Sequence, residues 1–337
     1  MRGRIAFLAG APILLGLALL ANLSIGATLL SPADLVAALL HFEPDDYSHY
    51  VLVYQRLPRA LIAIYAGAVL ACSGAVLQGL TRNPLAAPGT LGINAGATLF
   101  VVAGAYLFDL GIRAQGAAAL AGALFGFVAC LTVARLAGNG HDPRGLALIL
   151  SGALVSMLFS GLANAFLLSD PARRTDFLGW VSGNINHVYA ERLYAFWWIG
   201  LPALAALQLL ARPLTLIMLG PEKAASSGVN AAVVSRAALA AVVLGSGSAV
   251  AICGPVGFVG LMVPHMVRPF VGSGFALGLP ACALTGATVC LMADLAARQA
   301  FSPYVLHTGV LLDLLGGIVF ALIVKRFYLS SRAGGRP

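Results

Sequence analysis

Long uncharged stretches dominate this chain, and its few charged residues lie in short clusters between them. Only 9% of the residues are charged, while 60% are hydrophobic. A lipid bilayer offers the backbone no water, so each stretch must satisfy its own N–H and C=O groups. Glycine-rich apolar stretches without strand alternation do so as helices. The sequence therefore predicts an all-α, polytopic integral membrane protein.

The length of the chain limits the number of crossings. About 20 residues carry a helix across a bilayer, so 337 residues leave room for roughly ten spans and none for a separate soluble domain. We expect a single transmembrane domain over 1–337, whose eighth span is short and interrupted by proline. The predicted spans cover 5–30, 57–80, 90–109, 114–138, 144–168, 192–211, 236–253, 256–271, 276–297 and 305–324.

The basic residues predict the orientation of the chain. Lys and Arg are enriched on the cytoplasmic side of membrane proteins, and alternating crossings place 13 of the 20 on the side of the amino terminus. Both termini are therefore expected in the cytoplasm. Arg2 and Arg4 precede an apolar core, as in a cleavable signal, but the apolar run continues to Leu30. We expect a retained helix, with a cleaved signal as the alternative.

Small residues predict close packing between helices. Glycines stand four residues apart at Gly92–Gly96, Gly122–Gly126 and Gly274–Gly278, a spacing that lets helix backbones approach each other. All five cysteines fall in apolar spans without C-x-x-C spacing. We expect these cysteines to be inert packing residues.

Two segments rich in proline and glycine, 82–89 and 254–265, interrupt the apolar runs, one in each half of the chain. Paired interruptions of this kind are typical of transporters that build their path from broken helices. The chain would then carry its path near these breaks.

The longest polar stretch on the predicted cytoplasmic side is 212–236. It is expected to contain a short surface helix, because Pro221 suits a first turn, Glu222 suits the positive helix end and Gly228 suits a stop. A plain connecting loop is the alternative. Small residues along such a helix would form a docking surface for another protein.

The motifs of several enzyme classes are absent from the sequence. A P-loop needs Gly-Lys followed by Ser or Thr, and the only lysines, Lys223 and Lys325, follow Glu222 and Val324. There is no H-E-x-x-H motif, and 245–249 does not fit G-x-S-x-G. We therefore expect no catalytic residue, no metal site and no ATP hydrolysis by this chain.

Two acidic residues lie within predicted spans. Asp294 stands four residues before Arg298, a spacing that permits a structural ion pair, and we favour this role over proton coupling. Asp313 lies near the middle of the last span, where it either faces a wet path or makes a polar contact between helices.

Several motifs resemble those of one transporter family, in order and over nearly the whole chain. They are Arg56-Leu57-Pro58-Arg59, Gln78, Arg82-Asn83-Pro84-Leu85-Ala86 with Pro88 and Leu91-Gly92, Gly254-Pro255-Val256-Gly257-Phe258-Val259-Gly260-Leu261, and Val263-Pro264-His265 with Arg268. With these motifs the chain resembles the FecCD/BtuC-type permease subunits of ATP-binding-cassette importers for iron siderophores, haem and vitamin B12 (cobalamin).

The resemblance implies a homodimer of ten-helix subunits in the bacterial inner membrane, with a cargo path along the dimer axis. Two cytoplasmic ATPase subunits would bind ATP and Mg, so this chain would hold no cofactor of its own. A periplasmic binding protein would deliver the cargo. Membrane lipid is the remaining expected partner, and nucleic acid is not expected.

The resemblance also implies roles for individual residues. Binding-protein docking is implied for Arg56, Arg59 and Arg298, although snorkelling at a helix end is the alternative for the first two. The coupling helix of this chain, which would seat in a groove of the ATPase, would contain Leu219, Gly220, Glu222, Lys223 and Ala224. The cytoplasmic gate would contain Asn83, Pro84, Leu85, His141 and Asp142. Helix-break and path candidates are Gly254, Pro255, Gly257, Pro264, His307 and Asp313.

The two histidines near these motifs are read differently. His265, near the end of a span, is expected to be structural. At His307 the chain departs from the Pro-x-Gly that the family usually has, because it reads His307-Thr308-Gly309. This departure affects the outline of the last span and the shape of the path.

Haem is the favoured cargo on general resemblance, with a ferric siderophore or cobalamin as the other candidates. A self-sufficient secondary carrier or channel is a competing hypothesis, and it predicts uptake by the purified chain alone. An intramembrane enzyme is disfavoured, because the sequence has no constellation of nucleophile and base.

Overall fold

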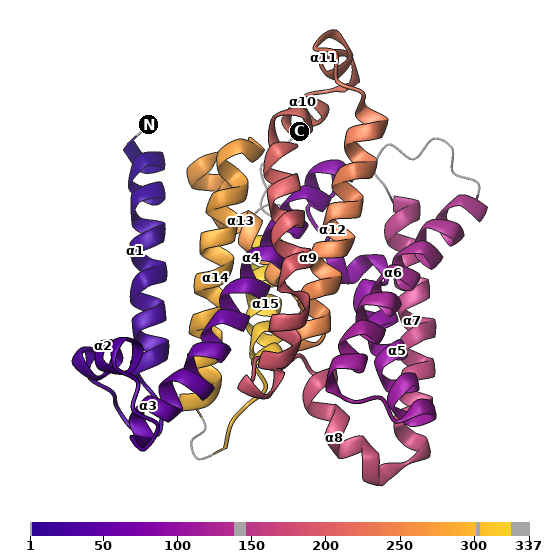
Figure 1. Ribbon diagram of the computed structural model, residues 1–337. Helices are drawn as coiled ribbons and strands as arrows, with labels where there is room; N and C mark the ends of the chain where they lie inside the picture. The colour runs from indigo at the N-terminus through magenta and orange to yellow at the C-terminus, as the bar shows by residue number, and fades with distance from the viewer. Residues whose placement is uncertain (1, 138–145, 301–303, 325–337) are drawn as a thin grey trace.

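The computed structural model describes residues 2–137, 146–300 and 304–324. All regular structure in these ranges is helical (Figure 1), which confirms the predicted all-α class. Three short helical turns of other types are η1 Leu52–Arg56, η2 Pro88–Leu91 and η3 His187–Tyr189. The α-helices are α1 Arg2–Ser24, α2 Pro32–Leu40, α3 Tyr47–Val51, α4 Leu57–Leu80, α5 Ile93–Phe108, α6 Ile112–Leu136, α7 Leu146–Ser169, α8 Pro171–Val181, α9 Ala190–Leu209, α10 Ala211–Met218, α11 Pro221–Ser226, α12 Ala231–Cys253, α13 Val259–Val271, α14 Phe275–Gln299 and α15 Thr308–Val324.

The apolar helices coincide with the predicted spans. Six segments of the described chain are long and apolar enough to cross a membrane, and α9 with α10 forms a further candidate that bends by 55°. Three shorter apolar helices, α5, α13 and α15, complete the set. The predicted eighth span is α13, which is short but runs through Pro264 and Pro269 as one continuous helix, so the expected break at Pro264 is wrong.

The first span ends earlier than predicted. Helix α1 stops at Ser24, so the predicted end at Leu30 is wrong. The Arg56 guanidinium donates hydrogen bonds to the carbonyls of Leu23 (2.7 Å), Ser24 (2.9 Å) and Thr28 (2.6 Å). The last carbonyls of a helix have no partner within it, so this side chain from a distant segment satisfies the end of α1.

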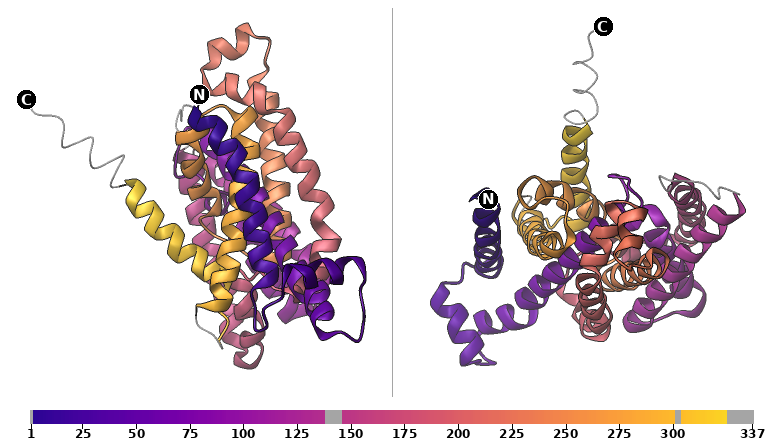
Figure 2. Two further views of the ribbon diagram at one scale, coloured as in Figure 1. Left: turned by 90° about the vertical axis from the view of Figure 1, so that its left-hand side faces the viewer. Right: turned by 90° about the horizontal axis from the view of Figure 1, so that it is seen from above.

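Helix α4 runs through the centre of the bundle (Figures 1 and 2) and is buried along almost its whole length. It packs backbone to backbone against two neighbours. Gly67 faces Gly286 of α14, and Gly74 faces Gly260 of α13; a Cβ on either α4 glycine would overlap the carbonyl of its partner. Small residues at such crossings let helices in a membrane approach closely.

Two of the three predicted glycine pairs make close contacts. On α5 and α6, Gly96 faces the Gly122 carbonyl, and Gly126 faces the Gly92 carbonyl. The prediction for Gly274–Gly278 is wrong, because a Cβ at either position would have no atom of the described residues within 4 Å. The same spacing therefore packs helices only where a neighbour lies over it.

The bundle has two distinct ends. Helix α1 begins at the end where α11 projects, here called the α11 end, while α2, α3 and α8 lie at the opposite end (Figure 1). Helix α15 starts near the opposite end and leans away from the other helices as it rises (Figure 2). The candidate sites lie at these two ends and at the helix breaks between them.

Candidate functional site

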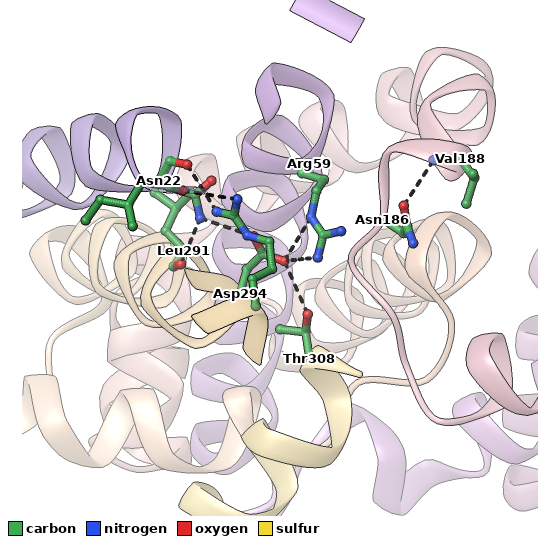
Figure 3. Close-up of polar contacts among 9 residues, drawn as sticks. Asn22, Arg59, Asn186, Val188, Leu291, Asp294 and Thr308 are labelled. Carbon is green, nitrogen blue, oxygen red and sulfur yellow. Dashed lines mark hydrogen bonds and ion pairs between the residues drawn. The ribbon is translucent and has the colours of Figure 1, made fainter. Parts of the chain in front are cut away.

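A buried charge cluster joins four helices near the opposite end (Figure 3). Its centre is Asp294 of α14, which is fully buried. Arg59 of α4 donates to Asp294 Oδ1 from Nη2 at 2.7 Å and from Nε at 3.3 Å. Arg298 Nε lies 3.2 Å from Oδ2, which confirms the predicted structural pair. Asn22 of α1 donates to Oδ2 at 3.2 Å, and Thr308 of α15 donates to Oδ1 at 3.4 Å.

The three arginines predicted for binding-protein docking all turn inward. Arg56 and Arg59 are only 4% and 8% exposed, and Arg298 donates to the Asn22 carbonyl at 3.1 Å. Their guanidinium groups therefore interact mainly with other groups of the same chain, and these interactions connect α1, α4 and α14. Docking by these three residues stays a prediction.

Other arginines at the opposite end are more exposed. The Arg113 side chain is 74% exposed, and it pairs with Glu191 at 3.1 Å. The Arg173 side chain is 44% exposed and lies 3.3 Å from Asp109. These pairs are solvent-facing, so a partner of opposite charge can compete for them.

Sequence analysis missed the role of Arg192. It is 1% exposed, and its guanidinium lies between the rings of Trp180 and Tyr189, 5.5 Å and 5.1 Å from their centroids. Its Nη2 donates to Gln115 Oε1 at 2.6 Å. Cation–π contact stabilises a desolvated guanidinium. Both aromatic partners precede Arg192 in the sequence, and Tyr189, three residues before it, is the signal that could have revealed this site.

The predicted short surface helix is confirmed as α11 at the α11 end. Gly220 precedes it with φ of +127°, a conformation that L side chains rarely adopt. Glu222 stands in the first turn, exposed, and Gly228 follows the helix with φ of +73°. Of the predicted coupling residues, Leu219 and Lys223 are exposed, while Ala224 is buried.

The predicted gate segment forms a turn between α4 and η2. Asn83 Oδ1 accepts a hydrogen bond from the Leu85 N–H at 2.9 Å, a side-chain turn that takes the place of helix after Thr81. Pro84 follows Asn83, and Leu85 is 38% exposed. The two other predicted gate residues, His141 and Asp142, lie outside the described residues.

The second break, 254–258, separates α12 from α13. Gly254 has φ of +77°, and a Cβ there would overlap the Trp180 carbonyl at the end of α8. The Asn184 N–H donates to the Cys253 carbonyl at 2.8 Å. Pro255 follows Gly254 in this non-helical segment. The break therefore meets the loop after α8 rather than continuing one straight helix.

One cavity of about 150 Å³ lies between the two predicted breaks. Segment 87–90 of the first break and 256–258 of the second both line it, together with Asn94 of α5. Asn94 Oδ1 is buried without a hydrogen-bond partner among the described residues. The structure thus brings together two segments that are far apart in the sequence, as paired breaks near a path require.

The last span places its predicted path candidates beside this region. The Asp313 carboxylate lies against Gly257, where a Cβ would overlap Oδ1, and the residue is exposed at the surface of this chain. The His307 ring lies 3.3 Å from the position of a Cβ on Gly179 of α8. His265 has a structural contact instead, with Nδ1 2.8 Å from the Leu261 carbonyl.

Comparison with known proteins agrees with this arrangement. The family model of the FecCD transport family matches residues 14–326. The chain belongs to the FecCD transport family. It is 33% identical, over 82% of its length and 83% of the relative, to "Probable siderophore transport system permease protein YfiZ" of Bacillus subtilis. It is 34% identical, over 93% of both chains, to the hemin transport system permease protein HmuU of Yersinia pestis.

A solved structure supports the same assignment for this FecCD permease. That structure, described as an inward-facing conformation of a metal-chelate type ABC transporter, matches with a TM-score of 0.79 at 28% identity. The match covers 95% of this chain and 99% of the other. The protein is therefore a multi-pass inner-membrane permease subunit of the FecCD transport family. It works with separate ATPase and substrate-binding partners and is not itself an enzyme.

The FecCD permease also has a polar hollow at the α11 end. Its volume is about 490 Å³. Its walls come from the end of α4, the segment between α10 and α11, and the end of α13. The lining residues are Gln78, Gly79, Arg82, Pro84, Met218, Leu219, Gly220, Arg268 and Ser273.

The cysteines and the metal-binding residue types form no site within the described ranges. All five cysteines are free and buried, as predicted for packing residues. Cys72 and Cys253, for example, donate their S–H groups to the carbonyls of Leu279 and Ala249. The described chain has no group of three or more His, Cys, Asp or Glu residues that could hold a metal ion.

Proposed function

We propose that two copies of this permease form the path of the importer, with the α11 end in the cytoplasm. Two ATPase subunits bind the dimer, one on α11 of each copy, and a periplasmic binding protein docks at the opposite end. ATP and Mg bind to the ATPases, so this chain binds no cofactor, and lipid surrounds the assembly. The observation that carries the proposal is the cavity where the two helix breaks meet.

The exposed helix α11 supports the position of the ATPases. It projects beyond the rest of the bundle (Figure 1), and most of its side chains are exposed. The excess of Lys and Arg on the side of the amino terminus supports the orientation. An exposed helix that follows a rigid turn transmits a conformational change to the bundle only when a partner, here the ATPase, is bound to it.

Asp313 supports a water-filled path beside α15. An ionisable residue within a membrane span faces a wet cavity or a protein partner, because a carboxylate in lipid costs several kcal/mol. Asp313 is exposed on this chain, and it borders the second helix break through Gly257. A path between two copies would take this carboxylate out of contact with lipid.

The cargo we propose is an iron chelate or tetrapyrrole, with haem as the first to test and ferric siderophores and cobalamin as the others. The relatives named above include both siderophore and hemin permeases at nearly equal identity. Selection among these cargoes would rest largely with the binding protein, because the cavity at the breaks is small and mainly apolar.

Reconstitution tests this function. The permease in proteoliposomes, together with the ATPase and the binding protein, should accumulate one of these cargoes only when ATP is present. Uptake by the permease alone under a proton or sodium gradient would establish the secondary carrier instead.

Substitutions in α11 test its role as the coupling element. Gly220→Val and Glu222→Arg should each lower the amount of cargo transported per ATP hydrolysed by at least about tenfold relative to the wild type. A tenfold loss corresponds to about 1.4 kcal/mol of coupling free energy. Arg236→Gln, at an exposed residue near the start of α12, is the control. Normal uptake by both α11 variants would remove α11 from the ATPase contact.

Cysteine labelling tests whether Asp313 faces water. Asp313→Cys should react with a charged, membrane-impermeant maleimide in the assembled importer, whereas Leu17→Cys on the exposed apolar face of α1 should not. The native cysteines are all buried, so the wild type gives the background. Equal protection of both new cysteines would contradict a wet path at this position.

A further inference from the structure

The hollow at the α11 end contains two arginines without acidic partners. Arg82 and Arg268 both line it. No hydrogen bond or ion pair joins either guanidinium to another described residue, and none of the lining residues is acidic. The other titratable groups that act electrostatically on or with Arg268 are His265 and Cys282. Among the described residues, no acidic group therefore balances the two positive charges in the hollow.

The backbone holds Arg82 in this position at a cost. Arg82 has φ of +49°, a left-handed conformation that is uncommon for residues other than glycine. Such a conformation is strained and persists where the surroundings impose it. Here Thr81 ends α4, and the Asn83 side chain closes the following turn on Leu85. The strained residue lines the hollow together with Gly79 and Pro84 of the same segment.

The third wall of the hollow leads directly into α11. Met218, Leu219 and Gly220 line the hollow and immediately precede the first residue of α11. A protein seated on α11 would therefore cover the mouth of the hollow. It would bring its own side chains within reach of both guanidiniums.

We propose that this hollow is a second contact for the ATPase, in which Arg82 and Arg268 receive a carboxylate side chain of that subunit. This inference rests on the proposed function, because it takes the ATPase as the protein on α11. Guanidinium groups bind carboxylates with two parallel hydrogen bonds, which fixes orientation as well as position. Beside the gate segment, such a contact links the ATPase to the turn at Asn83 as well as to α11.

The contact makes a specific prediction about salt. Two unpaired positive charges at a partly exposed site attract an acidic partner at long range, and salt screens this attraction. Affinity between permease and ATPase should therefore fall as ionic strength rises. Removing either guanidinium should reduce both the affinity and its dependence on salt.

Binding measurements in defined lipid test the proposal. The full permease is placed in nanodiscs of phosphatidylcholine, and the ATPase subunit that co-purifies with it is titrated at low and high salt. Arg82→Gln and Arg268→Gln should each weaken binding at low salt by at least about tenfold, which corresponds to about 1.4 kcal/mol. Arg236→Gln is the matched control, because Arg236 is exposed near the start of α12 and does not line the hollow. It should change the affinity by less than twofold, within about 0.4 kcal/mol.

The outcomes separate this inference from the proposed function. If Gly220→Val and Glu222→Arg abolish binding while both glutamine variants bind as the wild type does, the ATPase seats on α11 and the hollow is not a contact. If the wild type itself does not bind the ATPase, the proposed function fails. Arg82 is exposed, so Arg82→Gln decides the matter even if Arg268→Gln does not fold.

A lipid headgroup is the competing occupant. Nanodiscs with added phosphatidylglycerol distinguish it. If the glutamine variants lose affinity only in the phosphatidylglycerol nanodiscs, the arginines bind a lipid phosphate and the proposal is overturned. If the glutamine variants already lose affinity in nanodiscs that contain only phosphatidylcholine, the result supports a carboxylate of the ATPase as the group that the arginines bind.

Discussion

The arginines discussed at the two ends of the bundle differ in whether they have partners within the described chain. At the opposite end, Arg59 and Arg298 share the buried Asp294, and Arg56 is held by backbone carbonyls. At the α11 end, Arg82 and Arg268 line an open hollow, and none of its described lining residues is acidic. Charges that are balanced within a chain fix its helices, whereas charges left unbalanced mark a surface that another molecule completes. The inward-facing arginines at the opposite end thus hold helices together, whereas Arg82 and Arg268 at the α11 end are available to a partner.

Removal of the shared acid is the strongest test of this contrast. Asp294→Ala should lower the stability of the isolated permease by about 3–5 kcal/mol, because it leaves buried positive charges without compensation. Thermal unfolding in detergent micelles measures the loss. Glu191→Ala breaks an exposed pair and should cost less than about 1 kcal/mol. Equal effects of the two changes would show that the buried cluster does not hold the helices together.

Substitution of glycine on α14 separates the contribution of packing from that of charge. Gly286→Ala should destabilise the permease by about 1–3 kcal/mol, because the added methyl group meets the backbone of α4. Gly278→Ala, on the same helix but without a neighbour, is the control. It should unfold at the wild-type temperature or above it. A tolerated alanine at 286 would leave the charge cluster as the main link between α4 and α14.

The smallest effect is expected at the hollow. Arg268→Gln should change the stability of the isolated permease by less than about 1 kcal/mol, because no described residue makes a hydrogen bond or ion pair with this guanidinium. Its thermal unfolding is compared with that of Arg59→Gln, which removes a buried pair. A large loss from Arg268→Gln would mean that Arg268 supports the fold itself, and the contrast between the two ends would disappear.

The helices and their breaks could be predicted from the sequence because their causes are local. Apolar length defines a span, and proline with glycine defines a break, as at Gly254 and Pro255. The partner of Arg59 could not be predicted in this way, because its acceptor, Asp294, lies 235 residues away in the sequence. The Asp294–Arg298 pair was accessible to prediction because both residues lie on one helix.

The same distinction explains the errors. Gly274–Gly278 has the spacing of the packed pairs on α5 and α6, but spacing does not tell which helix lies opposite. The end of α1 depends on Arg56, which approaches from another segment. The hollow required the ends of three elements to meet, so no single motif indicated it, although Arg82 and Arg268 both belong to motifs that the sequence displays.

The glycine-to-carbonyl crossings limit how the permease can move. At Gly67 and Gly74 the backbone of α4 rests directly on α14 and α13, so these helices cannot slide past one another without atomic overlap. Helices α5 and α6 are interlocked in the same manner at Gly96 and Gly126. Movements between packed bodies occur by small shifts of side-chain contacts. Helices α4, α13 and α14 thus form one closely packed group and α5 with α6 a second. Because α12 contacts both groups, we expect relative movement between them to occur at its contacts.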